Sequence, residues 1–140
     1  MTGPGAAPTD HAGLAVLGSD ECLELIRSRP VGRIAFARDG DIELLPVNHC
    51  VLGRTIAFRT ARGSKLTAAY DGAVVAFEVD AYDARRRTGW SVLVKGRADL
   101  VTDSSLLARL DDAGLGTWVP SASRAEWVVI HPDEISGRRL

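Results

Sequence analysis

The segment spanning residues 58–65 carries side chains that could bind an anion. It takes a predicted strand through a glycine-containing turn into the start of a predicted helix. Arg59 offers a planar fork of N–H donors, Lys65 a compact positive charge, and Thr60 and Ser64 two hydroxyls. Backbone N–H groups at a helix start add further donors, so the combination predicts a phosphate site. The alternative is an ordinary strand-to-helix connection in which Ser64 caps the helix and the arginines face water.

A second segment, residues 46–49, could bind the edge of a heteroaromatic ring. Pro46 and Val47 close an apolar stretch, and Asn48 and His49 follow with an amide and an imidazole. Both groups donate and accept hydrogen bonds. Because no serine or acid at a suggestive spacing marks His49 as a member of a catalytic triad, the alternative is a structural hydrogen bond from its ring.

Two acids and a run of three arginines could interact with one another. Glu78 and Asp80 alternate onto the same side of one predicted strand, an arrangement that a pair of catalytic carboxylates requires. The nearby loop holds arginines at 85–87, which favours ion pairs over acid–base catalysis. The same loop could instead grip an anionic cofactor or substrate.

No metal site is predicted. Cys22 and Cys50 lack the spacing of a zinc site or a disulfide framework, so both are expected to be small buried hydrophobic residues. The three histidines are far apart in the sequence and show no ligand spacing with one another.

The elements that must position these groups are mainly strands. From residue 31 onward, short stretches rich in Val, Ile, Phe and Thr alternate with turn signals, which is typical of antiparallel β structure. Helices are predicted at 20–28, after a cap at Ser19, at 64–70, and beginning after residue 102 or 103. Residues 1–13 are expected to form a disordered tail before one domain at 14–140. The predicted strands cover 31–38, 42–51, 55–60, 73–82, 90–100 and 126–131, and six strands with short connections suggest a barrel.

Composition excludes several classes of function. The chain of 140 residues has 17 basic and 18 acidic side chains, so no strong positive field would attract nucleic acid. Residues 1–13 lack the pattern of a signal peptide, and no apolar run approaches a membrane span, which makes a cytoplasmic protein without a membrane partner the expectation. Several strands are apolar on both faces, so a second subunit is expected to cover what the helices leave open.

Taken in order, the segments resemble the pyridoxamine 5′-phosphate oxidase-like, or split-barrel flavin reductase, family from residue 19 to residue 140. The resemblance implies a six-stranded antiparallel split β-barrel with flanking helices, paired as a homodimer with FMN in two clefts at the subunit interface. It places Arg59, Thr60, Ser64 and Lys65 at the cofactor phosphate, and Pro46 to His49 along the flavin ring. Ser91 falls where the true oxidases contribute a glutamine to the ring, and Trp90 would line the same cleft. The segments that carry the resemblance are GRIAF, LLPVNH, TIAFRTARGSK, VAFEVD, GWSVLVKGRA and IHPDEISGRRL.

One departure from the family pattern affects the expected activity. The true oxidases end in an aromatic-rich segment with an arginine and a histidine that hold the vitamin phosphate, whereas residues 134–140 read EISGRRL. The sequence therefore predicts an FMN-dependent oxidoreductase acting on another small organic substrate. The alternatives are a deazaflavin-dependent reductase, whose acidic cofactor tail the arginines at 85–87 would bind, and a non-catalytic protein that binds flavin, heme or lipid. No catalytic residue is predicted, because a flavin itself exchanges hydride.

Overall fold

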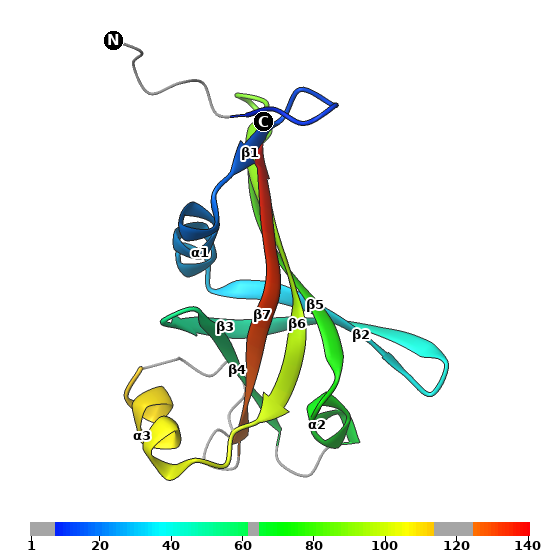
Figure 1. The fold of residues 1–140 in the computed structure, drawn as a ribbon, viewed down its shortest axis with the longest axis vertical. Coiled ribbons are helices and arrows are strands. Elements are labelled where there is room, and N and C mark those ends of the chain that lie inside the picture. The colour runs from blue at the N-terminus through cyan, green and yellow to red at the C-terminus, as the bar shows by residue number, and fades with distance from the viewer. Residues whose placement is uncertain (1–7, 62–64, 114–124) are drawn as a thin grey trace.

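The computed structural model describes residues 8–61, 65–113 and 125–140. Within them the chain forms seven strands and three helices (Figure 1). The helices are α1 (Ser19–Arg27), α2 (Lys65–Tyr70) and α3 (Ser104–Asp112). The strands are β1 (Ala15–Leu17), β2 (Val31–Arg38), β3 (Asp41–Leu52), β4 (Thr55–Ala61), β5 (Val74–Asp83), β6 (Thr88–Leu100) and β7 (Ala125–Arg139).

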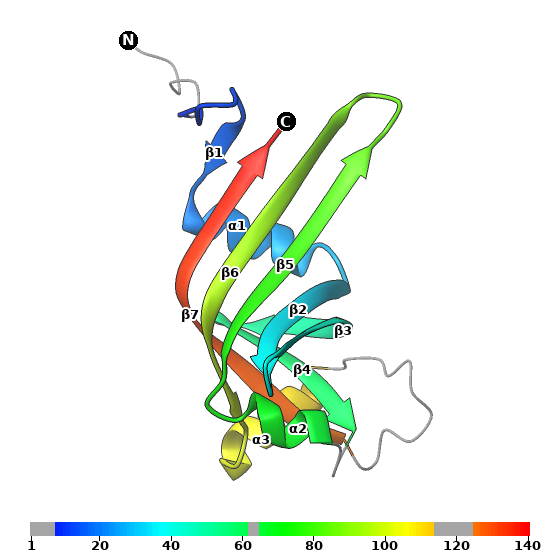
Figure 2. The ribbon, with the colours of Figure 1, turned by 90° about the vertical axis from the view of Figure 1, so that its right-hand side faces the viewer.

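Six of these strands close into a barrel. The sheet order is β1-β7-β4-β3-β2-β5-β6, and a further pairing of β6 with β7 joins the two sides. All of these pairings are antiparallel. The short strand β1 adds to β7 outside the ring. The predicted split-barrel architecture with flanking helices is confirmed, and Figure 2 shows β5, β6 and β7 extending past the barrel as a long arm.

The last strand differs from its prediction. The expected strand at 126–131 is wrong in its extent, because β7 continues to Arg139. Pro132 reads locally as the end of a strand because it has no N–H to donate. In the structure it lies opposite Gly96 at a register shift between β6 and β7, and pairing resumes beyond it at Glu134. A bulge thus accommodates the proline without ending the strand.

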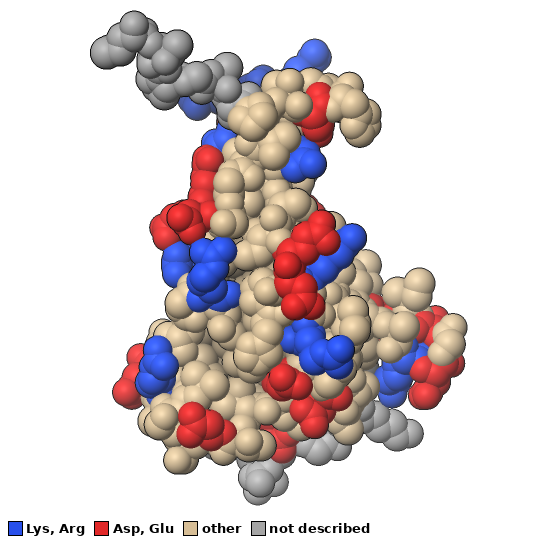
Figure 3. All heavy atoms as spheres, in the orientation of Figure 1, with Lys and Arg blue, Asp and Glu red and all other residues tan. Residues whose placement is uncertain are grey.

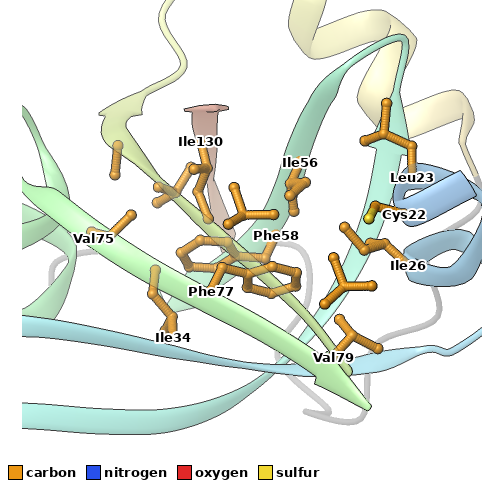
Figure 4. Packing of buried hydrophobic residues seen from close by; sticks show 14 of the residues in the cluster. Cys22, Leu23, Ile26, Ile34, Ile56, Phe58, Val75, Phe77, Val79 and Ile130 are labelled. Atoms are coloured by element: carbon orange, nitrogen blue, oxygen red, sulfur yellow. The ribbon is translucent and has the colours of Figure 1, made fainter. Parts of the chain in front are cut away.

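The barrel interior is a single hydrophobic cluster. Phe58 and Phe77 are fully buried near its centre, as the close view in Figure 4 shows. Helix α1 packs Cys22 and Ile26 into the same cluster, which confirms the expected burial of that thiol. Helix α2 contributes Tyr70, whose ring centroid lies 5.2 Å from that of Phe58.

A second, smaller cluster lies under helix α3. Leu110 of this helix packs with Ala57, Trp127 and Val129, which lie on the face of β4 and β7 that points away from the barrel interior. Asp103 caps the helix by accepting a hydrogen bond from the Ser105 N–H, so the predicted helix start is confirmed. Helix α3 therefore covers the outer face of β4 and β7.

Part of the expected N-terminal tail contacts the barrel. Thr9 forms a bridge with Ala15, and the Asp10 carboxylate accepts hydrogen bonds from the Ala12 and Leu14 N–H groups. Asp10 also pairs with Arg138 at 3.0 Å. Residues 8–13 thus lie against the fold, and residues 1–7 of the predicted tail lie outside the described residues. No helix in the described part of the chain has the length and apolar character to cross a membrane.

Candidate functional site

The outer face of β2, β3, β5 and β6 is not covered by the described helices. Alternate side chains of these strands fill the barrel core, so the others point outward. Three large apolar residues on this side are well exposed, namely Ile42 at 77%, Leu44 at 64% and Val74 at 70%. We call this surface the open face. It comprises Val31, Arg33, Ala35 and Ala37 of β2, Ile42, Leu44, Pro46 and Asn48 of β3, Val74, Ala76, Glu78 and Asp80 of β5, and Ser91, Leu93, Lys95 and Arg97 of β6.

Three of the predicted cofactor-binding residues, Pro46, Asn48 and Ser91, share the open face. Asn48 lies opposite Val31 on the neighbouring strand, and Pro46 lies opposite Arg33. Ser91 lies on β6, with Asp80 as its neighbour on β5. Pro46 and Ser91 are exposed, and Asn48 is half-buried. The barrel therefore brings two separate sequence segments onto one surface.

Arg59 lies where the open face meets helix α3. The β3–β4 ladder ends at the pair of His49 with Phe58, and Arg59 follows Phe58 on β4. The Arg59 guanidinium carbon lies 4.6 Å from the centroid of the Trp127 ring, and Nη2 lies 3.5 Å from Asp111 Oδ1. The side chain remains 20% exposed. Sequence reasoning identified Arg59 but missed Trp127 and Asp111, because neither residue carries a local signal for contact with it.

Thr60 points to the other side of β4. Its Oγ1 lies 3.0 Å from Oγ1 of Thr67 on helix α2, at the end of the barrel. Adjacent residues of a strand face opposite sides, so Arg59 and Thr60 diverge instead of converging on one ligand. Ser64 and the Lys65 side chain lie outside the described residues. Of the two predicted phosphate-binding side chains that the structure describes, Arg59 lies at the edge of the open face and Thr60 points away from it, and the phosphate site itself stays a prediction.

His49 is a core residue in the structure. Its side chain is 4% exposed, and its ring packs edge-on against Phe77 with centroids 5.1 Å apart. Burial lowers the pKa of His49, so the ring is neutral and Nε2–H donates to the Ile26 carbonyl oxygen at 2.9 Å. This is the structural alternative considered from the sequence, and it ties β3 to the end of helix α1. The imidazole points into the barrel core and toward the Ile26 carbonyl, so the structure gives no support for its expected contact with a flavin edge.

Val47 and Trp90 also face the interior side of their strands. Both are partly buried and pack against the main core. Beyond the core, Trp90 lines a hollow of about 320 Å³ on the arm, together with Arg29 and Arg139. Arg139 in this hollow pairs with Glu21 at 2.8 Å. Trp90 and Ser91, which were expected to line one cleft, therefore lie on opposite faces of β6.

The two carboxylates on β5 form ion pairs, but not with the predicted arginines. Arg33 Nη1 lies 3.6 Å from Glu78 Oε1 and 3.8 Å from Asp80 Oδ2. Burial raises the pKa of Glu78 to about 7, and the hydrogen bond and charge of Asp80 act in the same direction, while Arg33 opposes them. The prediction of ion pairing is confirmed, and the prediction that the arginines at 85–87 supply the partner is wrong. The register of β2 with β5 places Arg33 directly opposite Glu78.

The arginines at 85–87 lie at the tip of the arm, between β5 and β6. The backbone N–H groups of Arg85 and Arg86 donate to Asp83 Oδ1 at 3.0 and 3.2 Å, which shapes the turn. The side chains remain exposed. Arg59 lies on another strand near the opposite end of the barrel, so these two basic sites are separate.

The groups gathered on the open face are suited to binding and contain no evident nucleophile with its base. Arg59, Arg33, Asn48 and Ser91 supply hydrogen-bond donors next to exposed apolar side chains. Among the described residues no group of three or more His, Cys, Asp or Glu side chains could hold a metal ion. The arrangement fits a planar, partly apolar ligand that carries an anionic group.

Comparisons with known proteins agree on one family. The family model described as pyridoxamine 5′-phosphate oxidase matches residues 18–139. An uncharacterised protein of Mycobacterium tuberculosis is 36% identical over 140 residues, covering 96% of this chain and 91% of the relative. The solved structure of an FAD binding protein from Mycobacterium smegmatis has 38% identity and a TM-score of 0.79, covering 90% of this chain and 99% of the other. A conserved protein of unknown function from Corynebacterium diphtheriae has 34% identity and a TM-score of 0.76, covering 89% and 96%.

Proposed function

Because this chain belongs to the pyridoxamine 5′-phosphate oxidase family, we propose that it binds a flavin phosphate and acts as an oxidoreductase on a small organic substrate. The flavin phosphate would be FMN, as the sequence predicts, or the corresponding half of FAD. The observation that carries the proposal is the 38% identity to the FAD binding protein of Mycobacterium smegmatis, over nearly the whole of both chains.

The donor set of the open face fits this group. Arg59 of β4 offers a guanidinium for the phosphate. Asn48 offers an amide for the polar edge of the ring, and Ser91 a hydroxyl. Exposed apolar residues such as Leu44 supply the surface that an apolar ring system needs. Binding at Arg59 competes with its 3.5 Å contact to Asp111, which is longer than a strong charge-assisted hydrogen bond.

A bound flavin supplies hydride transfer, and the protein supplies binding and orientation. In this proposal Arg59 fixes the anionic end of the cofactor, and Asn48 orients the ring through hydrogen bonds. The apolar residues around them exclude water, which strengthens those hydrogen bonds. No side chain of the described part is assigned a proton transfer in this reaction.

We further propose that a second copy of the chain covers the open face, as the sequence predicts. Ile42, Leu44 and Val74 leave an apolar area that a monomer would expose to water. The same face carries acids on β5 and bases at Lys95 and Arg97 on β6, so a two-fold interface could match these charges to their opposites. Figure 3 shows acidic and basic side chains interspersed over the face in view, without a large area of one sign. Mixed charge of this kind suits self-association better than binding to a strongly charged polymer.

The test of the cofactor site compares FMN, FAD and riboflavin in titrations monitored by flavin fluorescence. Arg59→Ala should weaken the binding of FMN and FAD by about 1.5 to 3 kcal/mol, the range for hydrogen bonds to charged groups, and change riboflavin binding much less. Lys65→Ala, chosen from the sequence, should act in the same direction. Arg54→Ala is the matched control, because Arg54 is exposed and pairs with Asp20 away from the open face.

Two results would count against the assignment. Equal losses for riboflavin and FMN in Arg59→Ala would mean that Arg59 does not hold the phosphate. The absorption spectrum of the purified protein separates flavin from deazaflavin and heme, the cofactors left open by the sequence. A heme spectrum would contradict the proposal directly, and a deazaflavin preference that is lost when the arginines at 85–87 are replaced would move the site to the arm.

A further inference from the structure

The centre of the open face holds an unbalanced cluster of charge. The Arg33 guanidinium lies 3.6 Å from Glu78 Oε1 and 3.8 Å from Asp80 Oδ2, so two carboxylates share one cation. With both acids ionised, the cluster carries a net charge of −1. Glu78 Oε1 has almost no solvent exposure and no hydrogen-bond partner, although the whole side chain is 34% exposed.

The nearest neighbours of Glu78 are largely apolar, whereas Ser91 lies beside Asp80. Ala76 is the neighbour of Glu78 on the same face of β5, and Leu93 pairs with Glu78 across on β6. On the other side, Arg33 of β2 pairs with Pro46 of β3. The next charged residues are Lys95, which lies between Ala76 of β5 and Glu134 of β7, and Arg138 of β7, which pairs with Ser91. Arg97 lies two residues beyond Lys95 on β6, opposite Val74. The Arg38–Glu43 pair belongs to the opposite side of β2 and β3, because these residues alternate with the outward-facing ones.

We propose that two copies of the chain associate through the open face with the uptake of one proton by each Glu78–Asp80 pair, so that acid strengthens the dimer. This inference rests on the dimer put forward under the proposed function. It adds a property that the dimer alone does not require, because an apolar interface with balanced charges would associate equally well across neutral pH.

The physical reason is the cost of covering unpaired charge. A second copy removes water from the cluster, and a two-fold interface contains every cluster twice. A buried carboxylate without its own cation is strongly disfavoured, and the protein avoids that state by binding a proton. Burial and Asp80 already raise the pKa of Glu78 to about 7 in the single chain. Further burial acts in the same direction, so the dimer holds its protons at a pH where the free chain releases them.

The linkage has a definite sign and size. Because the dimer binds more protons than two free chains, its dissociation constant must rise as the pH rises through the pKa of the free chain. If both pairs keep their proton in the dimer, the constant should increase by about a hundredfold between pH 6 and pH 8. One retained proton gives about tenfold, so at least a tenfold rise is expected.

The experiment measures the dimer dissociation constant at pH 6 and pH 8 by fluorescence-detected sedimentation, at constant ionic strength. Glu78→Gln mimics the protonated acid, so this variant should associate at pH 8 about as tightly as the wild type at pH 6, with little dependence on pH. Glu24→Gln is the matched control, since Glu24 is exposed on helix α1, and it should follow the wild type. A structural requirement for the Glu78 charge would instead weaken the variant at both pH values.

Each remaining outcome decides the question. A wild-type dimer whose dissociation constant is the same at both pH values, or a Glu78→Gln variant that keeps the full dependence, overturns the inference and leaves the dimer intact. A monomer at every pH overturns both the dimer and the inference. If the dimer persists at the lowest concentration, the ¹³C-carboxyl NMR signals of the intact dimer decide. A proton retained by the Glu78–Asp80 pair at pH 8 supports the inference, and full ionisation at pH 7 overturns it.

Discussion

Replacing Gly96 by alanine should destabilise the barrel at the bulge where β6 meets β7. A Cβ atom on Gly96 would lie 2.1 Å from the His131 carbonyl oxygen and 3.1 Å from Pro132 Cα. Both are backbone atoms, so no side chain can turn aside. An ordinary carbon–oxygen contact is about 3.3 Å or longer, so β7 would have to move away by roughly 1.2 Å. The position cannot absorb this shift locally, because Arg97 pairs with His131 directly beside it.

The expected cost follows from three contributions. Overpacking in a dense interior costs about 1 to 3 kcal/mol, and each ladder hydrogen bond lost costs about 1 kcal/mol. The lower backbone entropy of an unfolded chain with alanine offsets about 0.4 to 1 kcal/mol. With one ladder hydrogen bond lost, the net loss should be about 1 to 4 kcal/mol, against the 5 to 15 kcal/mol that usually separates folded from unfolded domains.

Urea unfolding followed by tryptophan fluorescence measures this difference. Protein and flavin concentrations must be held constant, because association and ligand binding both add to apparent stability. Gly18→Ala is the control, since its Cβ would meet nothing within 4 Å and its φ is −74°. The control should change stability by no more than about 0.5 kcal/mol. If Gly96→Ala were as stable as the control, the bulge would not depend on the close approach described for it.

Three further outcomes are expected. Burial lowers the pKa of His49, so at acid pH the unfolded chain binds a proton that the folded chain does not bind, and the free energy of unfolding should fall by up to 1.4 kcal/mol per pH unit below about pH 6.5. In urea titrations at several pH values His49→Gln should lose this pH dependence, and an unchanged dependence in the variant would contradict the assignment. Leu44→Asp should convert the dimer to a folded monomer in light scattering, because it puts a negative charge in place of an apolar side chain that is 64% exposed on the open face. A dimer that persists in this variant would place the interface elsewhere. Pyridoxal 5′-phosphate should form only at background rates when the FMN-saturated protein receives pyridoxine or pyridoxamine 5′-phosphate. The reason is that the two C-terminal arginines already form ion pairs, Arg138 with Asp10 and Arg139 with Glu21. A turnover rate within about tenfold of that of an authentic oxidase would refute this prediction.

The sequence by itself determined the local features of this fold. Alternation of apolar residues located β2 through β6 to within a few residues, since a strand packed on one side must repeat every second residue. The turn at Asp39 and Gly40 joins β2 and β3 through residues with φ of 52° and 79°, which these residue types favour. The order of the segments also indicated the family, because spacing along the chain is itself a property of the sequence.

The site residues were identified only in part. Asn48, Pro46 and Ser91 do share one surface, and Arg59 lies at its edge. The phosphate site predicted at residues 58–65 stays a prediction, and within it the side chains of Arg59 and Thr60 point to opposite faces of β4. His49 could not be separated from a ligand-binding residue by its type, since the same imidazole nitrogen serves a backbone carbonyl or a cofactor.

Only the tertiary structure decided which distant residues meet. Arg33 pairs with Glu78 because β2 and β5 are neighbours in the barrel, although the two residues are 45 positions apart in the sequence. Strand β7 continues through Pro132 because Gly96 on another strand leaves room for a bulge. Such pairings depend on register between strands that are remote in sequence, and register is fixed by burying one face of each strand in a common core. No local pattern carries that information, because the free energy of burial belongs to the assembled barrel and not to any one segment.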